Sequence, residues 1–195
     1  MKVDKTLPSF ITKDEMTYLL DVKKFTNDFE GVRNKMLLEL FYSTGIRLSE
    51  LIALKVTDVD YVNKQIKVFG KRSKERIIPL LDSCLDSLRF YVESYRFEVV
   101  EKDASLFLTK SGNVLYPKLV YRIVNSYLGD VTGVKQKSPH ILRHAFATHM
   151  LNEGADLNAI KEILGHSSLT STQIYTRSSA ERLKEIYKQA HPRGN

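Results

Sequence analysis

The spacing of apolar residues changes once along this 195-residue chain, and that change limits the folds it can adopt. Over most of the length apolar residues recur every three or four positions, which is the period of an amphipathic helix. Between residues 60 and 80 they alternate instead, which predicts two strands, Gln65–Phe69 and Glu75–Pro79, joined by a basic turn. The sequence therefore predicts an α+β fold that is mainly α-helical, with a small antiparallel β-sheet.

Polar cap residues and glycines mark the ends of the predicted helices. The expected N-caps are Thr12 (with Glu15 completing a capping box), Ser49, Ser138 and Asp156, and the expected C-terminal glycines are Gly45 and Gly165. With these limits, helices are expected over residues 12–25, 32–45, 49–55, 82–97, 116–128, 138–151, 156–165 and 180–190. We find no internal repeat and no linker rich in Gly, Ser or Pro that would divide the chain.

The composition indicates the class of partner and the compartment. Thirty Lys and Arg against 23 Asp and Glu give a net charge of +7, which favours nucleic acid as the partner; an ordinary basic surface is the alternative. The single cysteine, Cys84, excludes an intrachain disulfide and a Cys-rich zinc site. No apolar run approaches the roughly 20 residues that cross a bilayer, and the start lacks a signal-peptide pattern, so we expect a cytoplasmic protein.

The predicted helix over residues 138–151 carries three histidines and an arginine. His140 and Arg143 are three residues apart, so they project from one face. They lie near its first turn, where free backbone amides and the helix dipole attract phosphate. Together they could form a site for an oxyanion. The alternative is a structural role, with His140 hydrogen-bonded and partly buried and the Arg143 side chain lying along the surface.

A metal site is a second interpretation of this helix. His140 and His144 have the spacing of two zinc ligands, and His149 or His166 could supply a third. The zinc-hydrolase motif needs a glutamate beside its first histidine, however, and Ile141 stands there. We therefore expect no metal and no other cofactor.

Five separated motifs decide between these interpretations. They are "STGIRLSELIALK", "KVFGKRSKERIIPL", "HILRHAFATHML", "ILGHSS" and "STQIYTR". Their order and spacing resemble those of tyrosine recombinases of the phage integrase family, in particular the Xer branch, over nearly the whole chain. The resemblance implies the DNA breaking-rejoining fold of the tyrosine recombinase catalytic domain and the activity of a site-specific DNA recombinase.

The resemblance also implies a reaction and a role for each matching residue. In this family a tyrosine attacks the scissile phosphate, leaving a 3′-phosphotyrosyl bond and a free 5′-hydroxyl, and the step is then reversed on a partner strand without metal or ATP. Fixed cations must offset the charge that gathers on the phosphate. The implied catalytic residues are Arg47 and Arg143 (phosphate clamp), His140 (base), Lys71 (acid), His166 (phosphate donor) and Tyr175 (nucleophile).

The expected nucleophile differs from the other tyrosines in its surroundings. Tyr175 lies in a segment rich in Ser and Thr between two predicted helices, which suits exposure to DNA. Five other tyrosines fall on or beside apolar stripes, where tyrosine usually belongs to the core; they are Tyr91, Tyr95, Tyr121, Tyr127 and Tyr187. Tyr175 is therefore the expected site of the covalent bond.

Some neighbouring residues depart from the family pattern or have two interpretations. Arg72 follows Lys71 where the family often has glycine, and Lys74 stands three residues further on. Glu50 either orients Arg47 or is an exposed carboxylate favoured by the dipole at a helix start. His144 and His149 are expected to make structural hydrogen bonds.

The resemblance finally implies a domain organisation and partners. Residues 1–195 are expected to form the catalytic domain, with a C-terminal helix and tail over 179–195, and the family's N-terminal core-binding domain is absent from this chain. Double-stranded DNA is the expected partner, bound weakly and in a salt-sensitive way. We expect a monomer when free and a homo- or hetero-tetramer on DNA, joined through the C-terminal segment unless that helix folds back onto its own domain. The alternative function is a non-catalytic DNA-binding module; a type IB topoisomerase would share the chemistry.

Overall fold

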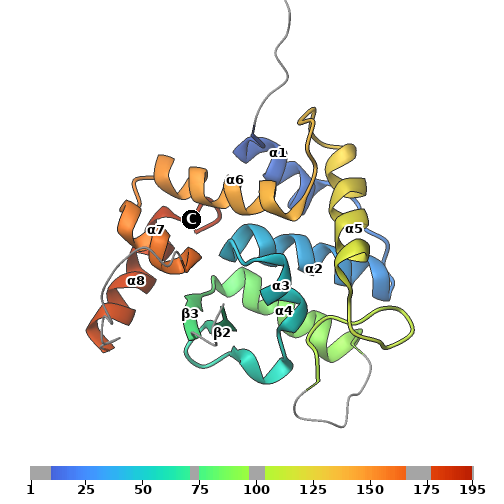
Figure 1. Ribbon diagram of the computed structural model, residues 1–195, viewed down its shortest axis with the longest axis horizontal. Coiled ribbons are helices and arrows are strands. Elements are labelled where there is room, and N and C mark those ends of the chain that lie inside the picture. Colours follow the sequence, from blue (N-terminus) through green and yellow to red (C-terminus); the bar gives the residue numbers. More distant parts are fainter. Residues whose placement is uncertain (1–9, 71–74, 97–103, 166–176, 195) are drawn as a thin grey trace, which may run out of the picture.

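The computed structural model describes residues 10–70, 75–96, 104–165 and 177–194 (Figure 1). Its α-helices are α1 (Lys13–Thr17), α2 (Phe29–Thr44), α3 (Leu48–Ala53), α4 (Asp82–Ser94), α5 (Pro117–Gly129), α6 (Pro139–Asn152), α7 (Leu157–Leu164) and α8 (Arg177–Ala190). A π-helical turn, η1 (Tyr18–Val22), continues α1, and η2 (Val56–Asp58) is a short 3₁₀ helix. Within these ranges no helix is both long and apolar enough to cross a membrane.

The sheet has three antiparallel strands in the order β1 (Val59–Asp60), β2 (Gln65–Phe69) and β3 (Glu75–Pro79). In the β2–β3 pair Gln65 lies opposite Pro79 and Phe69 lies opposite Glu75. The two predicted strands are therefore confirmed with their limits, as is the mainly helical α+β class. Strand β1 was not predicted, because two residues are too few to show alternation.

Helix α2 forms the centre of the molecule. Every residue from 36 to 46 is buried, so this helix is covered on all sides, as its dense apolar sequence predicts. Helix α6 packs along α2 and α4 packs on another part of it (Figure 1). Gly45 ends α2 in the left-handed region at φ 59°, with its N–H donating to Phe41 O at 2.9 Å. The predicted glycine stop is thus confirmed.

The first helix is shorter than predicted. Its capping box is present, with Thr12 N–H donating to the Glu15 carboxylate at 2.8 Å and Glu15 N–H donating to Thr12 Oγ1 at 3.2 Å. The helix ends at Val22, three residues before the predicted end, because Lys23 takes an extended backbone. Lys23 N–H then closes the last turn on Tyr18 O at 2.8 Å, five residues back.

Three expected caps have different outcomes. Asp156 caps α7, where its side chain accepts hydrogen bonds from two backbone amides of that helix at 3.1 and 3.2 Å. Ser138 occupies the N-cap position of α6, but its side chain makes no capping bond. The prediction of Ser49 was wrong: Arg47 is at the N-cap position of α3 and donates its N–H to Glu50 Oε2 at 2.9 Å, so that Ser49 lies inside the first turn.

The last helix, α8, packs on its own chain. It begins three residues before the predicted start, and it buries Leu183, Tyr187 and Ala190 against the domain. The Tyr187 hydroxyl donates to Ser43 O in α2 at 2.6 Å. The residues after α8 return toward α6 (Figure 1), where the ring of His191 lies 6.0 Å from that of Phe146. In this chain, then, the C-terminal helix folds back onto its own domain.

Candidate active site

Arg47 is fixed in place by the connection between α2 and α3. The left-handed turn at Gly45 ends α2, and Arg47 has the extended backbone of an N-cap residue, at φ −77° and ψ 153°. The Glu50 carboxylate bonds both the backbone N–H of Arg47, at 2.9 Å, and its guanidinium Nη1, at 2.8 Å. Arg47 is therefore held at its backbone and at its side chain by one residue of the following turn.

Three arginines, here called the arginine cluster (Arg47, Arg76 and Arg143), meet at the C-terminal end of α7. They come from the start of α3, from β3 and from α6, and each donates to one of three consecutive carbonyl oxygens. The bonds are Arg76 Nε to Ile163 O (2.7 Å), Arg143 Nη2 to Leu164 O (2.8 Å) and Arg47 Nη2 to Gly165 O (3.0 Å). The last carbonyls of a helix lack partners within the helix and form the negative end of its dipole, so guanidinium groups suit them.

Arg143 also joins the cluster to the end of α2. Its Nη1 donates to Gly45 O, while Nη2 bonds α7. Burial, together with repulsion by Arg47 and Arg76, lowers the pKa of Arg143 to about 10. This shift reports three guanidiniums close together, and Arg143 is still a cation at neutral pH.

Glu50 is the carboxylate that the cluster surrounds. It is 5% exposed, and it accepts hydrogen bonds from Arg76 Nη1 at 2.6 Å and Nη2 at 2.8 Å as well as from Arg47. Burial alone would raise the pKa of Glu50, but the hydrogen bonds from Arg76 and Arg47 outweigh it and hold the pKa at about 2. Of the two interpretations of Glu50, the one in which it orients Arg47 is confirmed and the exposed carboxylate is wrong.

The charges of this site do not cancel. One carboxylate, Glu50, faces three guanidiniums, so the described part of the site has an excess of positive charge. The Arg47 side chain is 38% exposed, so solvent or a ligand can reach it. Planar donor groups that keep their charge match the oxygens of a phosphate diester. The geometry is therefore that of an anion site with its arginines already oriented.

His140 lies on the same helix as Arg143. Pro139 begins α6, and His140 follows it in the first turn, with its side chain exposed. Arg143 is one turn further along, so both project from one face, as the spacing predicts. The structural interpretation of His140 as a partly buried residue is wrong, because this side chain is open to solvent.

The other three predicted catalytic residues, Lys71, His166 and Tyr175, lie outside the described residues. The described chain stops on one side at Gly165, whose carbonyl oxygen accepts from Arg47. The separate gap that contains Lys71 ends at Glu75, the first residue of β3 and the neighbour of Arg76. Of the six predicted residues the structure thus brings Arg47 and Arg143 together and places His140 one turn from Arg143.

The two remaining histidines of α6 differ from each other. His149 is buried, with Nδ1 bonded to the Tyr42 hydroxyl at 2.8 Å and Nε2 bonded to Ile11 O at 3.0 Å, which confirms its structural role. Because both of its ring nitrogens are occupied, His149 is not available as a third metal ligand. His144 is exposed and makes no hydrogen bond to another described residue, so its structural role stays a prediction.

Arg76 is the site residue that sequence reasoning missed. It lies within the alternating segment "ERIIPL", where a polar residue reads as the solvent-facing side of a strand. In the structure its side chain is only 11% exposed. The signal available in the sequence was an arginine directly before two isoleucines in a predicted strand.

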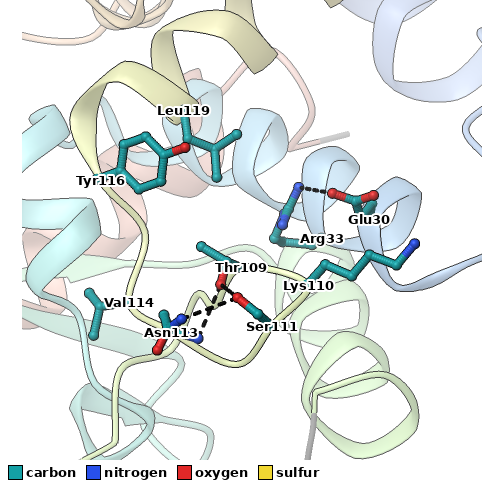
Figure 2. A pocket seen from close by; sticks show the side chains of 9 residues that line it. All are labelled: Glu30, Arg33, Thr109, Lys110, Ser111, Asn113, Val114, Tyr116 and Leu119. Atoms are coloured by element: carbon teal, nitrogen blue, oxygen red, sulfur yellow. Dashed lines mark hydrogen bonds and ion pairs between the residues drawn. The ribbon is translucent and has the colours of Figure 1, made fainter.

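A surface hollow of about 610 Å³ lies outside the arginine cluster, between α2 and the turn over residues 109–113 (Figure 2). Arg33 in its wall is 1% exposed and donates to Asn34 Oδ1 at 2.8 Å, to Leu108 O at 3.2 Å and to Glu30 at 3.4 Å. Arg33 therefore ties α2 to the neighbouring turn. None of the predicted site residues lines this hollow.

Known proteins similar to this chain include several recombinases. The XerC tyrosine recombinase of Chlorobaculum parvum (strain DSM 263 / NCIMB 8327) is 44% identical over 212 residues, which cover 98% of this chain and 63% of that protein. The crystal structure of XerA recombinase matches 96% of this chain and 65% of that one, with a TM-score of 0.71 and 30% identity. XerH site-specific recombinase, solved in a pre-cleavage complex with its difH substrate, matches 93% of this chain and 54% of that one (TM-score 0.69, 27% identity).

Each match covers nearly all of this chain but a smaller share of the protein that it is compared with. This chain is matched almost completely, but it spans about 63% of the length of the curated XerC relative. Its fold is that of a tyrosine recombinase catalytic domain. The sequence model of the phage integrase family matches residues 9–182, which is most of the chain. The chain therefore belongs to the phage integrase family.

Proposed function

We propose that this chain is the catalytic part of a site-specific DNA recombinase that cuts and rejoins DNA strands through a 3′-phosphotyrosyl intermediate. The observation that carries the proposal is the meeting of Arg47 and Arg143 at the end of α7. From that point, Gly165, the chain continues into the segment with His166 and Tyr175. The family membership and the similarity to XerC, XerA and XerH support the same function.

The two arginines suit the charge that develops in this reaction. When a phenol oxygen attacks a phosphate diester, negative charge gathers on the two nonbridging oxygens. Arg47 and Arg143 come from separate elements, so their guanidiniums can bind that phosphate as a clamp. Because Glu50 and the carbonyls of α7 already orient the two groups, little reorganisation is needed when DNA binds.

The remaining roles concern protons. A tyrosine has an ordinary pKa near 10, so Tyr175 must lose its proton during attack, and His140, exposed one turn from Arg143, is the proposed base. The leaving 5′-oxygen needs a proton, which Lys71 supplies. His166 donates a hydrogen bond to a phosphate oxygen. The reaction exchanges one phosphoester for another, and reversal on a partner strand restores the DNA backbone.

The first prediction tests the nucleophile. Tyr175→Phe removes the attacking hydroxyl but leaves the arginines, so we expect near-normal DNA binding and no covalent protein–DNA adduct. The assay mixes each protein with nicked duplexes of randomised central sequence and counts adducts that survive SDS. Tyr18→Phe is the control, because Tyr18 is exposed on η1, outside the site. An undiminished adduct in Tyr175→Phe would place the nucleophile elsewhere, and no adduct with the unaltered chain would leave only the non-catalytic DNA-binding module.

We also propose the partners and the assembly. Residues 1–195 act as the catalytic domain on double-stranded DNA, in the cytoplasm, as a monomer when free and as a homo- or hetero-tetramer on DNA. Helix α8 packs on its own chain in the structure, so docking on a neighbour would require this helix to leave that position. XerH was solved with its DNA substrate, which supports DNA as the partner.

The second prediction follows from the small number of phosphate contacts. We expect weak DNA binding, because few phosphate contacts release few counterions, and an affinity that still falls as salt rises from about 50 to about 200 mM. Sedimentation with and without DNA, repeated after deletion of the residues past Arg177, measures the assembly. An assembly on DNA that is unchanged by this deletion would contradict docking through the C-terminal segment, and salt-insensitive binding would contradict a phosphate-dominated interface.

A further inference from the structure

Among the described residues, the Arg76 side chain makes three hydrogen bonds within the site and that of each proposed clamp arginine makes two, yet the proposed reaction gives Arg76 no role. Its two terminal nitrogens bond the two oxygens of Glu50, at 2.6 and 2.8 Å, and its Nε bonds Ile163 O at 2.7 Å. The side chain is 11% exposed, whereas that of Arg47 is 38% exposed. Arg76 is thus less accessible to a phosphate than Arg47, and its three side-chain bonds go to protein groups.

These contacts use the shape of the guanidinium. One edge of the planar group holds the carboxylate of Glu50 in a bidentate pair, while the Nε–H points to a different target, the end of α7. A lysine ammonium is a single point charge and cannot hold both targets in this geometry. The contacts therefore require arginine at position 76, beyond the need for a positive charge.

Glu50 is shared between two arginines, and this sharing affects Arg47. Glu50 Oε1 accepts from Arg76 at 2.6 Å and from Arg47 at 2.8 Å. Without Arg76 the buried carboxylate would have Arg47 as its main counter-ion, so a two-pronged pair between these two would be favoured. Arg47 would then be drawn away from an incoming phosphate. Arg76 leaves part of the Arg47 guanidinium free to bind one.

The contact with α7 affects the other side of the site. Ile163, Leu164 and Gly165 accept from Arg76, Arg143 and Arg47 in turn, so Arg76 fixes the helix end to which both clamp arginines are bonded. The packing is close: a Cβ on Gly165 would lie 3.0 Å from Arg76 Cδ and 3.1 Å from its Nε. Movement of Arg76 would therefore be transmitted to the point where the chain enters the segment with His166 and Tyr175.

We propose that Arg76 is a positioning residue, which fixes Arg47 and Arg143 relative to each other by bonding Glu50 and the end of α7 at the same time. The proposal rests on the proposed strand-cleaving function, because it assigns the two arginines to the scissile phosphate. Arg76 itself does not contact DNA. Its effect is on the rate of cleavage in the bound complex rather than on binding.

The first arm of the test separates rate from binding. The substrate is the DNA sequence that the unaltered protein captures covalently from the randomised duplexes. The rate constant of adduct formation is measured at a saturating concentration of this duplex. For Arg76→Gln we expect this constant to fall about 10- to 100-fold, as for small misplacements of catalytic groups, with less than about a threefold change in Kd. Arg89→Gln removes an exposed guanidinium that stacks on Tyr61, and it should leave both quantities within about twofold.

Two further variants distinguish positioning from charge and from folding. Arg76→Lys keeps the charge but not the two-target geometry, so it should recover only part of the rate; full recovery would overturn the proposal. Arg76→Gln combined with Glu50→Gln should be about as slow as the slower single variant, because the two residues act as one unit. Additive losses in the rate constant would overturn the proposal. So would a loss confined to the amplitude of adduct formation, because a smaller amplitude at an unchanged rate constant means only that less of the protein is folded.

The last arm does not depend on DNA cleavage. In protein labelled with ¹⁵N-arginine, the Nε–H signals of Arg47 and Arg143 should shift in Arg76→Gln and stay in place in Arg89→Gln. If the unaltered chain forms no adduct while these signals shift, the proposed function fails and the positioning contacts stand. If adducts form while the signals of Arg47 and Arg143 do not respond to Arg76→Gln, the positioning proposal fails and the function stands.

Discussion

At the scale of single residues, the site depends on one buried carboxylate. Glu50 accepts a backbone N–H and three guanidinium N–H groups, so its negative charge offsets repulsion among the arginines that surround it. A buried ion pair stabilises little when compared with apolar packing, but removing one partner leaves the other charge uncompensated. Glu50 should therefore matter for stability as well as for the orientation of Arg47.

The third prediction concerns this carboxylate. A pKa lowered from 4.5 to about 2 corresponds to about 3 kcal/mol of stability, so Glu50→Gln should lose about that much at pH 7. Because the pKa is lower in the folded state, the contribution is complete above about pH 4.5 and is lost as the pH falls toward 2. Urea unfolding at pH 7 and pH 3 measures this difference, with the exposed Glu75→Gln as control. An equal difference in unfolding free energy between the unaltered protein and Glu50→Gln at both pH values would contradict this prediction.

At the scale of secondary structure, local signals predicted the elements well. The capping box at Thr12, the cap at Asp156 and the limits of β2 and β3 depend on neighbours in sequence, and the structure has all of them. The cap of α3 was mistaken because a glutamate side chain three residues on, rather than Ser49, satisfies the helix start. Arg76 was missed for a related reason: its partners, Glu50 and Ile163, lie 26 and 87 residues away.

The fourth prediction tests the turn that ends α7. Gly165 has φ 67° and Gly154 has φ 89°, so alanine at either position should cost about 1–2 kcal/mol through the left-handed backbone. At Gly154 an added Cβ meets nothing within 4 Å, whereas at Gly165 it would press on Arg76. Gly165→Ala should therefore also slow adduct formation per folded molecule, while Gly154→Ala should not. Equal cleavage rates in the two variants would show that the contact with Arg76 tolerates a methyl group.

At the scale of the whole molecule, the C-terminal segment closes the core. His191 follows α8, is 2% exposed and packs against the rings of Tyr42, Phe146 and Tyr187. Its Nδ1 accepts from the Arg193 N–H at 3.1 Å, and its Nε2 has no hydrogen-bond partner among the described residues. Sequence patterns predicted the apolar stripe of this helix, but they could not say which surface the stripe covers, because that depends on contacts with α2 and α6.

The fifth prediction follows from the burial of this imidazole. Burial, together with the nearby charge of Arg193, lowers the pKa of His191 to about 3, so the folded protein holds the neutral ring. The stabilisation is therefore complete above about pH 6.5 and is lost as the pH falls toward 3. When the pH falls from 7 to 5, the free energy of unfolding of the unaltered protein should fall by about 2 kcal/mol more than that of His191→Leu. Urea unfolding at the two pH values measures this difference. The same drop in both would mean that His191 is not the group that titrates.

The arginine cluster joins parts of the chain that are made at different times. Gly45 and Arg143 are 98 positions apart, and Arg47 and Gly165 are 118 apart, so neither pair of contacts can form until most of the polypeptide has left the ribosome. A nascent chain that has produced Arg47 still lacks α7, to which that guanidinium is bonded. The proposed strand-cutting centre can thus be assembled only after the chain has been synthesised beyond Gly165.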